Sequence, residues 1–222
     1  ALMREVYDEF QDVDLALARR IRGHDIHYVM MSSRMVYGAA DGPDFVLCED
    51  MEPLPDKVYG VNKLRIERGV AAVLGDKNLT ILRLSNVFGK EIERRSFFGM
   101  ALTCLVKNNE IRFNIAADSL RDFLSVERFC DYIVCVAAKP KAGVYNLGAG
   151  FGVRCGDVAR WLIEGYGLGE LVIEGESLDG QFVLDVARGR AAFGWGEYTL
   201  EQCREDCLAV GAFYRYNAQP RT

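Results

Sequence analysis

Short apolar runs alternate with segments of helical periodicity in the first part of this chain, and that alternation constrains the fold most strongly. Residues 27–31 form a short apolar run, and Leu79–Leu84 is rich in leucine and isoleucine, the pattern of strands buried on both faces of a parallel sheet. Val13–Ile21 and residues 60–74 show helical spacing, and Gly75 follows the second segment as a typical helix-ending residue. Strand–helix alternation of this kind predicts an α/β fold with a doubly wound parallel sheet.

A tyrosine and a lysine stand four residues apart in the sequence Tyr59-Gly-Val-Asn-Lys63. If the segment from residue 60 onward is helical, positions i and i+4 share a face, and the Lys63 ammonium can lie beside the Tyr59 phenol. A free tyrosine has a pKa of about 10, and a neighbouring positive charge lowers it towards the range useful for proton transfer at neutral pH. The same spacing also occurs by chance on solvated helix faces, so the pair alone does not establish a site.

Ser32 and Ser33 directly follow the first apolar run. Open α/β sheets bind ligands beyond the carboxyl ends of their strands. Ser33 is therefore predicted to hydrogen-bond the same substrate oxygen as Tyr59.

Several sequence blocks, in this order, resemble the extended short-chain dehydrogenase/reductases that act on nucleotide sugars, the NAD-dependent epimerase/dehydratase family. The blocks are Tyr28-Val-Met-Met-Ser-Ser-Arg-Met-Val-Tyr37-Gly38, Glu49-Asp50 with Pro53, Tyr59-Gly-Val-Asn-Lys63, Leu82-Arg-Leu-Ser-Asn86-Val-Phe-Gly89, Leu120-Arg-Asp-Phe-Leu-Ser-Val126 and Val144-Tyr-Asn-Leu-Gly-Ala-Gly150. The last two resemble the UDP-galactose 4-epimerase group. The similarity extends from about residue 12 to the final helix near residue 212.

This resemblance implies a cofactor, a substrate class and a role for each residue of the candidate site. The cofactor is NAD or NADP, the substrate is a nucleoside-diphosphate sugar, and the assembly is a homodimer. Tyr59 is the general acid/base and also contacts the cofactor, while Lys63 lowers the pKa of Tyr59 and binds the nicotinamide ribose. Ser33 orients the substrate oxygen, and Ser32 contacts the cofactor. The hydride chemistry belongs to the cofactor.

Two residues outside this group are implied to bind the substrate. In similar epimerases the arginine of the Leu-Arg-Asp-Phe block contacts the nucleotide diphosphate, a task that suits a planar, permanently charged group, and here it is Arg121. A salt bridge with Asp118 or Asp122 is the alternative role. Asn86 matches a residue that contacts the substrate phosphate, and a turn asparagine is its alternative. Residues 178–180 replace a second phosphate-binding arginine of the epimerases, so the nucleotide's identity stays open.

The positions after Ser33 distinguish reaction classes. Sugar dehydratases of this family have an Asp-Glu pair or a single Glu there, as the acid and base for elimination of water. This chain has Arg34 and Met35, so dehydration is disfavoured. Hydride transfer remains, either reversible within one sugar (epimerisation) or net (reduction of a keto sugar).

The family begins with a strand, a glycine-rich turn and a helix whose N-terminus binds the dinucleotide pyrophosphate. Only 32 residues precede Ser33, and none forms such a turn. The glycines at 148, 150 and 152 lie far downstream and are interpreted as a backbone turn rather than a phosphate site. We therefore expect a partial sequence, in which the N-terminal part of the sheet is absent.

Composition and charge restrict the partners and the compartment. The net charge of −5 does not favour nucleic acid or an anionic membrane surface, and no apolar run approaches the ~20 residues of a membrane span. The seven cysteines form no C-x-x-C pair, and the two histidines, His24 and His27, lie at no metal-ligand spacing from them. Buried reduced thiols, no metal site and a cytoplasmic location are predicted.

The expected domains follow the family. Residues 1–89, together with 125–150, form the C-terminal half of a Rossmann-like dinucleotide-binding domain, and residues 90–124 and 151–222 form a smaller α/β substrate-binding domain. Thr199-Leu-Glu-Gln202 has the form of a capping box ahead of a last helix.

The predicted function is an NAD(P)-dependent nucleotide-sugar epimerase or 4-ketoreductase. The alternative is a non-catalytic relative that binds a nucleotide sugar or a partner protein. Retention of Ser33, Tyr59 and Lys63 together argues against that alternative, because a binding module does not need all three.

Overall fold

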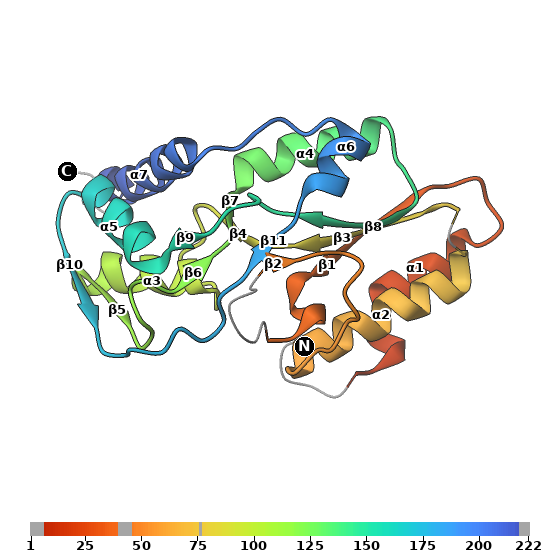
Figure 1. Cartoon of the computed structure of the whole chain (residues 1–222), viewed down its shortest axis with the longest axis horizontal. Coiled ribbons are helices and arrows are strands. Elements are labelled where there is room, and N and C mark those ends of the chain that lie inside the picture. Colours follow the sequence, from red (N-terminus) through yellow and green to blue (C-terminus); the bar gives the residue numbers. More distant parts are fainter. Residues whose placement is uncertain (1–6, 40–45, 76, 218–222) are drawn as a thin grey trace. The chain divides into compact units, whose positions relative to one another are not determined.

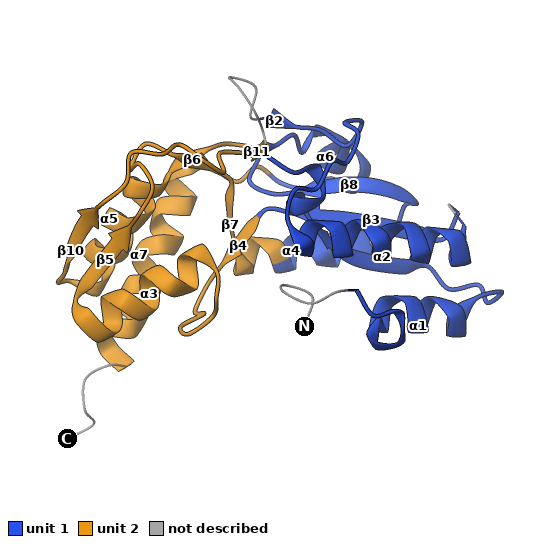
Figure 2. Ribbon diagram, turned by 90° about the horizontal axis from the view of Figure 1, so that it is seen from below, with its two compact units in different colours: residues 1–85, 130–150, 184–196 blue, residues 86–129, 151–183, 197–222 orange. Residues whose placement is uncertain are grey.

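The computed structural model describes residues 7–39, 46–75 and 77–217, which form two compact units (Figure 2). Unit 1 comprises residues 1–85, 130–150 and 184–196, and unit 2 comprises residues 86–129, 151–183 and 197–222.

Unit 1 is built on a parallel sheet of three strands. They are β1 (Tyr28–Ser33), β3 (Leu79–Leu84) and β8 (Gly143–Leu147), in the order β1-β3-β8. β1 extends beyond its apolar run, so that Ser32 and Ser33 are its last two residues. Both serines therefore lie at the carboxyl end of a strand, where a sheet of this kind binds ligands.

Helices cover both faces of this sheet (Figure 1). α1 (Val13–Ile21) and α2 (Val58–Leu74) lie on one face, while α6 (Ala187–Phe193) and the unit 1 residues of α4 (Val126–Ala138) lie on the other. Parallel strands with helices on both faces confirm the predicted Rossmann-like, doubly wound α/β fold.

Helix α2 begins at Val58, two residues before its predicted start, so Tyr59 lies in its first turn. It ends before Gly75, which has φ 71° and whose N–H donates to the carbonyl of Ala71 at 2.8 Å. Glycine adopts this left-handed conformation without a steric penalty, and the predicted helix end is confirmed. The helix buries one face in the core of unit 1, whose buried members are Ala18, Met30, Ile66, Val70, Leu79 and Ile81.

Shorter elements complete unit 1. These are η1 (Glu9–Gln11), η2 (Arg34–Tyr37), β2 (Val46–Leu47) and β11 (Val183–Leu184). Leu184, the last residue of β11, is the first residue of the unit 1 segment 184–196. The predicted domains placed that segment with the substrate-binding half. In the structure it belongs to unit 1, because the Asp185 N–H donates to the Leu47 carbonyl of β2 at 2.9 Å and α6 packs on β8.

The described residues of unit 2 form three strand pairs and three further helices. The pairs are β4 (Asn86–Phe88) with β7 (Phe123–Ser125), β5 (Glu110–Phe113) with β10 (Glu170–Ile173), both parallel, and the antiparallel β6 (Leu120–Arg121) with β9 (Val153–Arg154). The helices are α3 (Phe97–Asn108), α5 (Cys155–Tyr166) and α7 (Leu200–Asn217), and α5 packs along α7.

Aromatic side chains fill the centre of unit 2, and a capping box starts its last helix. The ring of Phe97 lies 4.7 Å from that of Phe113 and 5.6 Å from that of Phe123. The Thr199 N–H donates to the Gln202 side chain at 3.0 Å, and the Gln202 N–H donates to the Thr199 hydroxyl at 3.2 Å. This reciprocal pair confirms the predicted capping box.

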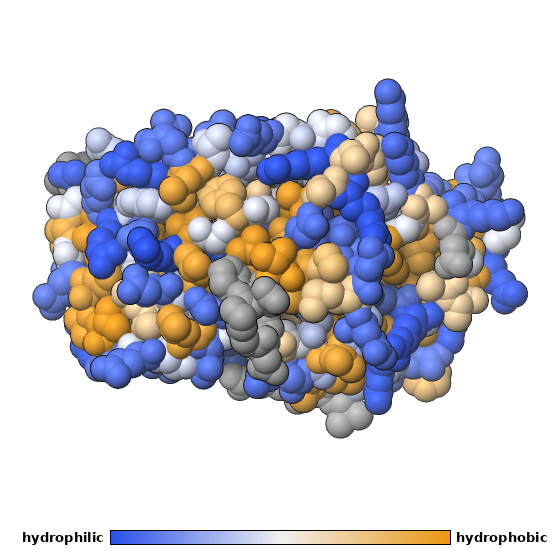
Figure 3. Space-filling view, in the orientation of Figure 1, coloured by the Kyte–Doolittle hydropathy of each residue, from blue (hydrophilic) through white to orange (hydrophobic). Residues whose placement is uncertain are grey.

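The surface and the cysteine side chains can be compared with the expectations from the sequence. Among the described residues, no helix combines the length and apolar character needed to cross a bilayer. Figure 3 shows hydrophilic residues spread over the drawn face of both units. Cys155, Cys203 and Cys207 are buried, as predicted, but Cys130 is exposed because it lies on the outer side of α4. Burial raises the pKa of Cys155 to about 11, so it stays a thiol at neutral pH.

Candidate active site

The three residues predicted to carry out the chemistry all lie in unit 1. Ser33 ends β1, and Tyr59 and Lys63 lie one turn apart on α2. The start of α2 packs closely on η2, the turn that follows Ser33: a Cβ added to Gly60 would lie 2.2 Å from the carbonyl oxygen of Met35. Only glycine allows this approach, which brings the elements carrying Tyr59 and Ser33 together.

Lys63 is anchored to the sheet by its ammonium group. Its Nζ donates to the carbonyl oxygen of Met31 at 2.9 Å, and the side chain is half-buried. An ammonium carries three N–H donors, so two remain for a phenolate or for hydroxyl groups of a ligand. The contact fixes the charge at the end of β1, two residues before Ser33.

Ser33 and Ser32 direct their hydroxyls to different partners. The Ser33 Oγ accepts a hydrogen bond from the Met35 N–H at 3.2 Å, so the hydroxyl keeps its own proton to donate to a substrate oxygen. Ser32 is 3% exposed, and its Oγ donates to the carboxylate of Glu67. The predicted contact of Ser32 with a cofactor would therefore have to use main-chain atoms.

A buried ion pair lies directly beneath these serines. Arg83 Nη2 donates to Glu67 Oε2 at 2.8 Å and Arg83 Nε donates to Glu67 Oε1 at 3.2 Å, with side chains only 6% and 5% exposed. A two-pronged contact of this kind fixes both the distance and the orientation of the two groups. It connects α2 to β3.

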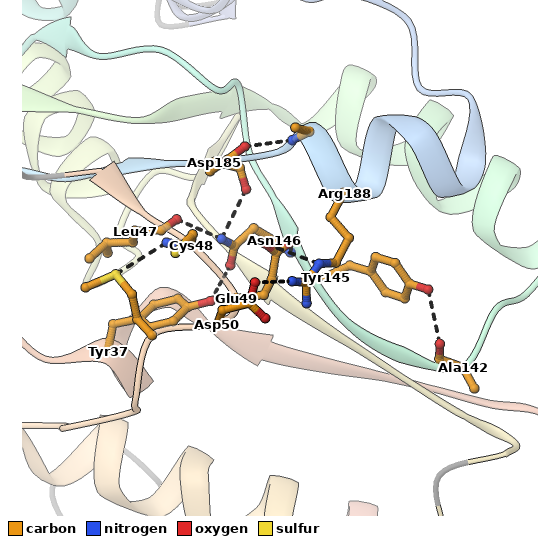
Figure 4. A network of polar contacts seen from close by, with 12 residues as sticks. Tyr37, Leu47, Cys48, Glu49, Asp50, Ala142, Tyr145, Asn146, Asp185 and Arg188 are labelled. Atoms are coloured by element: carbon orange, nitrogen blue, oxygen red, sulfur yellow. Dashed lines mark hydrogen bonds and ion pairs between the residues drawn. The ribbon is translucent and has the colours of Figure 1, made fainter.

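A second network of polar contacts begins at Tyr37, the last residue of η2 (Figure 4). The Tyr37 hydroxyl donates to Asn146 Oδ1 at 2.7 Å, and the Arg83 guanidinium lies 4.8 Å from the centre of the Tyr37 ring. Burial raises the pKa of Tyr37, although Arg83 partly opposes that effect, so the residue stays a neutral donor. The turn after Ser33 is therefore attached to β8.

Asn146 and Glu49 extend this network to the loop after β2. The Asn146 N–H donates to Glu49 Oε1 at 2.8 Å, and the Asn146 amide donates to the Leu47 carbonyl at 2.8 Å. The Glu49 carboxylate is 3% exposed, and Arg188 Nε lies 3.9 Å from its Oε2. Arg188 also contacts Asp50 at 2.6 Å, as Figure 4 shows.

Of the residues predicted to bind the substrate, Ser33 lies in unit 1, whereas Asn86 and Arg121 lie in unit 2. Arg121 Nη2 donates to the Asp179 carbonyl at 3.3 Å, and its guanidinium lies 5.0 Å from the centre of the Phe97 ring. Its Nε is buried without a hydrogen-bond partner. Of the alternative ion-pair partners, Asp118 contacts Arg154 at 3.3 Å.

Arg121 faces a cavity of about 550 Å³. The residues that line it are Phe97, Met100, Ala101, Cys104, Arg112, Phe113, Asn114, Ile115, Arg121 and Glu174. Asn86 begins β4 and is half-buried, and its N–H donates to the Asp122 carbonyl at 3.2 Å. It does not line this cavity.

The match to known families follows this arrangement. The model of the NAD dependent epimerase/dehydratase family matches residues 4–148. The chain belongs to this family. The resemblance inferred from the sequence blocks is thereby confirmed, as is a nicotinamide dinucleotide as the family's cofactor. None of the curated proteins matches the chain.

Several solved structures share this fold. MoeE5, solved with UDP-glucose and NAD, is 25% identical, with a TM-score of 0.76 over 93% of this chain and 71% of MoeE5. RMD from Pseudomonas aeruginosa, solved with NADPH, is 20% identical, with a TM-score of 0.73 over 91% and 72%. The UDP-glucuronic acid 4-epimerase from Bacillus cereus, solved with UDP-glucuronic acid and NAD, is 18% identical, with a TM-score of 0.78 over 98% and 73%.

The donors of unit 1 fit the cofactor of this epimerase/dehydratase family. A nicotinamide ribose presents hydroxyl groups, and the Lys63 ammonium, held at one N–H by Met31, has two N–H groups to offer them. Tyr59 is half-buried in the first turn of the same helix, one turn from that ammonium. Lys63 and Tyr59 would therefore hold the nicotinamide end.

Sequence reasoning missed Glu67 and assigned no role to Tyr37 or Glu49. A signal for Glu67 was present, because Tyr59, Lys63 and Glu67 follow one another at intervals of four on one helix face. Tyr37 and Glu49 appear only within longer blocks, and their partner Asn146 is about a hundred residues away in sequence. No local pattern connects residues so far apart.

Proposed function

We propose that the protein is an NAD(P)-dependent nucleotide-sugar epimerase or 4-ketoreductase in which Tyr59 is the general acid/base. The observation that carries this proposal is the Tyr59–Lys63 pair on α2, whose first turn packs on the turn after Ser33. A phenol, an ammonium and a hydroxyl are thus supplied by elements that meet at the carboxyl end of β1. Similar structures solved with UDP-sugars and NAD, or with NADPH, support the substrate and cofactor classes.

Each residue has one task in the proposed reaction. Tyr59 takes the proton of a sugar hydroxyl during oxidation and returns a proton to the keto oxygen during reduction. Lys63 stabilises the phenolate through its charge and binds the ribose, and Ser33 donates its hydroxyl proton to the same sugar oxygen. A bound nicotinamide dinucleotide supplies the hydride chemistry.

Unit 2 binds the nucleotide diphosphate in this proposal. The Arg121 guanidinium lies 5.0 Å from the centre of the Phe97 ring and lines the cavity of unit 2. A guanidinium contacts a phosphate through two parallel hydrogen bonds, which suits this position at a cavity. The contact of Asn86 with the phosphate, the homodimer and the cytoplasmic location stay predictions of the sequence.

Product analysis tests the reaction class. The complete gene product, incubated with NAD or NADP and a panel of UDP- and dTDP-hexoses or 4-keto sugars, is expected to form an epimer or a reduced sugar. Reduction consumes one reduced cofactor per product, whereas epimerisation consumes none. Because Arg34 and Met35 supply no acidic pair, no 4-keto-6-deoxy sugar is expected, and its detection by mass spectrometry contradicts the proposed class. Absence of dinucleotide binding by calorimetry contradicts the enzyme proposal altogether.

A further inference from the structure

Three polar side chains lie in register across the sheet of unit 1, one residue before its carboxyl edge. Ser32 of β1 is paired with Arg83 of β3, and Arg83 is paired with Asn146 of β8. All three are buried, with exposures of 3%, 5% and 0%. Because polar groups are costly to bury, a row of them across an apolar sheet needs a reason beyond packing.

Glu67 joins this row to the helix that carries Tyr59 and Lys63. Its carboxylate accepts hydrogen bonds from the Ser32 hydroxyl and from two nitrogens of the Arg83 guanidinium. Glu67 as a whole residue is 4% exposed. Lys63, one turn earlier, donates to the carbonyl of Met31. The helix is therefore attached to two consecutive residues of β1, immediately before Ser33.

We propose that Glu67, held by Arg83 and Ser32, is a positioning residue that fixes the placement of α2, and with it Tyr59 and Lys63, relative to Ser33. This inference rests on the proposed function. Apolar side chains pack without directional preference, whereas the two-pronged Arg83–Glu67 contact fixes the helix along its axis and around it. The requirement is strict, since a misplacement of ~1 Å at a reacting group can lower a rate by ~10²-fold.

Stability alone does not account for the pair. Replacing a buried ion pair by apolar residues of similar volume is often neutral or stabilising, whereas removing one partner leaves an uncompensated charge. A variant that removes both charges together therefore separates the structural role from the positioning role. The double variant E67M/R83M does this with side chains of comparable length.

The test measures turnover, KM and thermal stability of E67M/R83M in the complete gene product. We expect a melting temperature near that of the parent protein, a KM for the nucleotide sugar within about threefold, and a kcat lowered by ~10–10²-fold, because the reacting groups are displaced while substrate contacts remain. The matched control is Arg68→Met, one residue further along α2, whose side chain is exposed. This control is expected to leave kcat unchanged.

The pH–rate profile gives a readout that a purely structural role would not move. E67M/R83M removes one negative and one positive charge, so it has little direct electrostatic effect on Tyr59. If Lys63 is displaced, the pKa of Tyr59 that the profile reports should instead rise towards the unperturbed value of about 10. A parent-like kcat and a parent-like profile in this variant overturn the inference.

A second variant guards against misfolding of the first. Ser32→Ala removes only the hydrogen bond to Glu67, and we expect a kcat reduced by about three- to tenfold with the same upward shift of the pH profile. Parent-like values for Ser32→Ala overturn the inference if E67M/R83M does not fold. If Tyr59→Phe is inactive while both positioning variants behave like the parent, only the positioning inference is wrong. If Tyr59→Phe itself keeps full turnover, the proposed function fails and the inference falls with it.

Discussion

Around Ser33 in unit 1, Glu67 is bonded to Ser32 and Arg83, and Lys63 is bonded to the Met31 carbonyl, whereas the Arg121 guanidinium in unit 2 has a buried Nε without a partner. Lys63 and Glu67 each bond to β1, and the contacts of Glu67 are buried. Arg121 makes one long bond to a carbonyl and lies over an aromatic ring beside a cavity of about 550 Å³. The two regions differ in how many of their side-chain donors and acceptors are hydrogen-bonded within the protein.

This difference matches two kinds of task. Groups that must react in one geometry gain from being fixed before the substrate arrives, because the ordering cost is met during folding. A group that binds a ligand needs free donors, since a donor already satisfied by the protein gains little from a new partner. The proposed function requires this difference, because it assigns the reaction to the fixed groups of unit 1 and ligand binding to Arg121 of unit 2.

The largest effect is expected from Tyr59→Phe in unit 1. The substitution removes the hydroxyl that exchanges the proton and leaves the ring volume nearly unchanged, so kcat should fall by ~10²–10⁴-fold while KM and the melting temperature change little. Steady-state kinetics and thermal unfolding measure these quantities. Lys63→Ala should lower kcat and also weaken cofactor binding, measured by calorimetry. Near-parent turnover of Tyr59→Phe would mean that the pair is only a helix surface.

A smaller effect of the opposite kind is expected from Arg121→Met in unit 2. If this residue binds the diphosphate, KM should rise by ~10–10²-fold while kcat stays within a few-fold, because the lost contact is made equally in ground and transition states. The control is Arg154→Met on the neighbouring strand β9, whose charge is exposed and paired with Asp118. If Arg121→Met lowers kcat without changing KM, the proposal that Arg121 acts in binding and not in the reaction is contradicted.

Gly60→Ala tests the close approach of α2 to η2. The new Cβ would lie 2.2 Å from the Met35 carbonyl oxygen, so the backbone must shift, at a cost of about 1–3 kcal/mol in the free energy of unfolding and with a lower kcat. Gly69→Ala is the matched control on the same helix, because its Cβ would lie 3.5 Å from Leu15 Cδ1, an ordinary contact. That control should be neutral or stabilising, by up to about 1 kcal/mol. Equal effects of the two substitutions in chemical denaturation would contradict a special role for Gly60.

The smallest effect concerns pH and His27, which lies just before β1, far along the strand from Ser33. Burial lowers the pKa of His27, and its Nε2 is 2.7 Å from the Thr80 hydroxyl. Since the folded state disfavours the charged ring, the contribution of His27 to stability is full above its unfolded pKa of about 6.5 and is lost as the pH falls through the folded value. The melting temperature should therefore decrease from pH 7 towards pH 5, and less so in His27→Gln. An identical pH dependence in both proteins would contradict this assignment.

Sequence periodicity predicted much of unit 1 because its signals are local. The apolar runs of β1 and β3, the helical spacing of α1 and α2, and the interval between Tyr59 and Lys63 are all properties of neighbouring residues. Unit 2 was predicted less completely. Its strands β4, β6, β7 and β9 are two or three residues long, too short for an alternating pattern to stand out.

The α/β class, the family and the candidate trio of Ser33, Tyr59 and Lys63 could be read from the amino-acid sequence, because helix and strand periods and short motifs are properties of a few neighbouring residues. Three features became visible only in the folded chain: Ser32, Arg83 and Asn146 form one row, segment 184–196 belongs to unit 1, and Arg121 lines a cavity. These facts depend on strand register and on contacts between residues far apart in sequence. A buried charge such as that of Glu67 has a meaning only once its partners across the sheet are known.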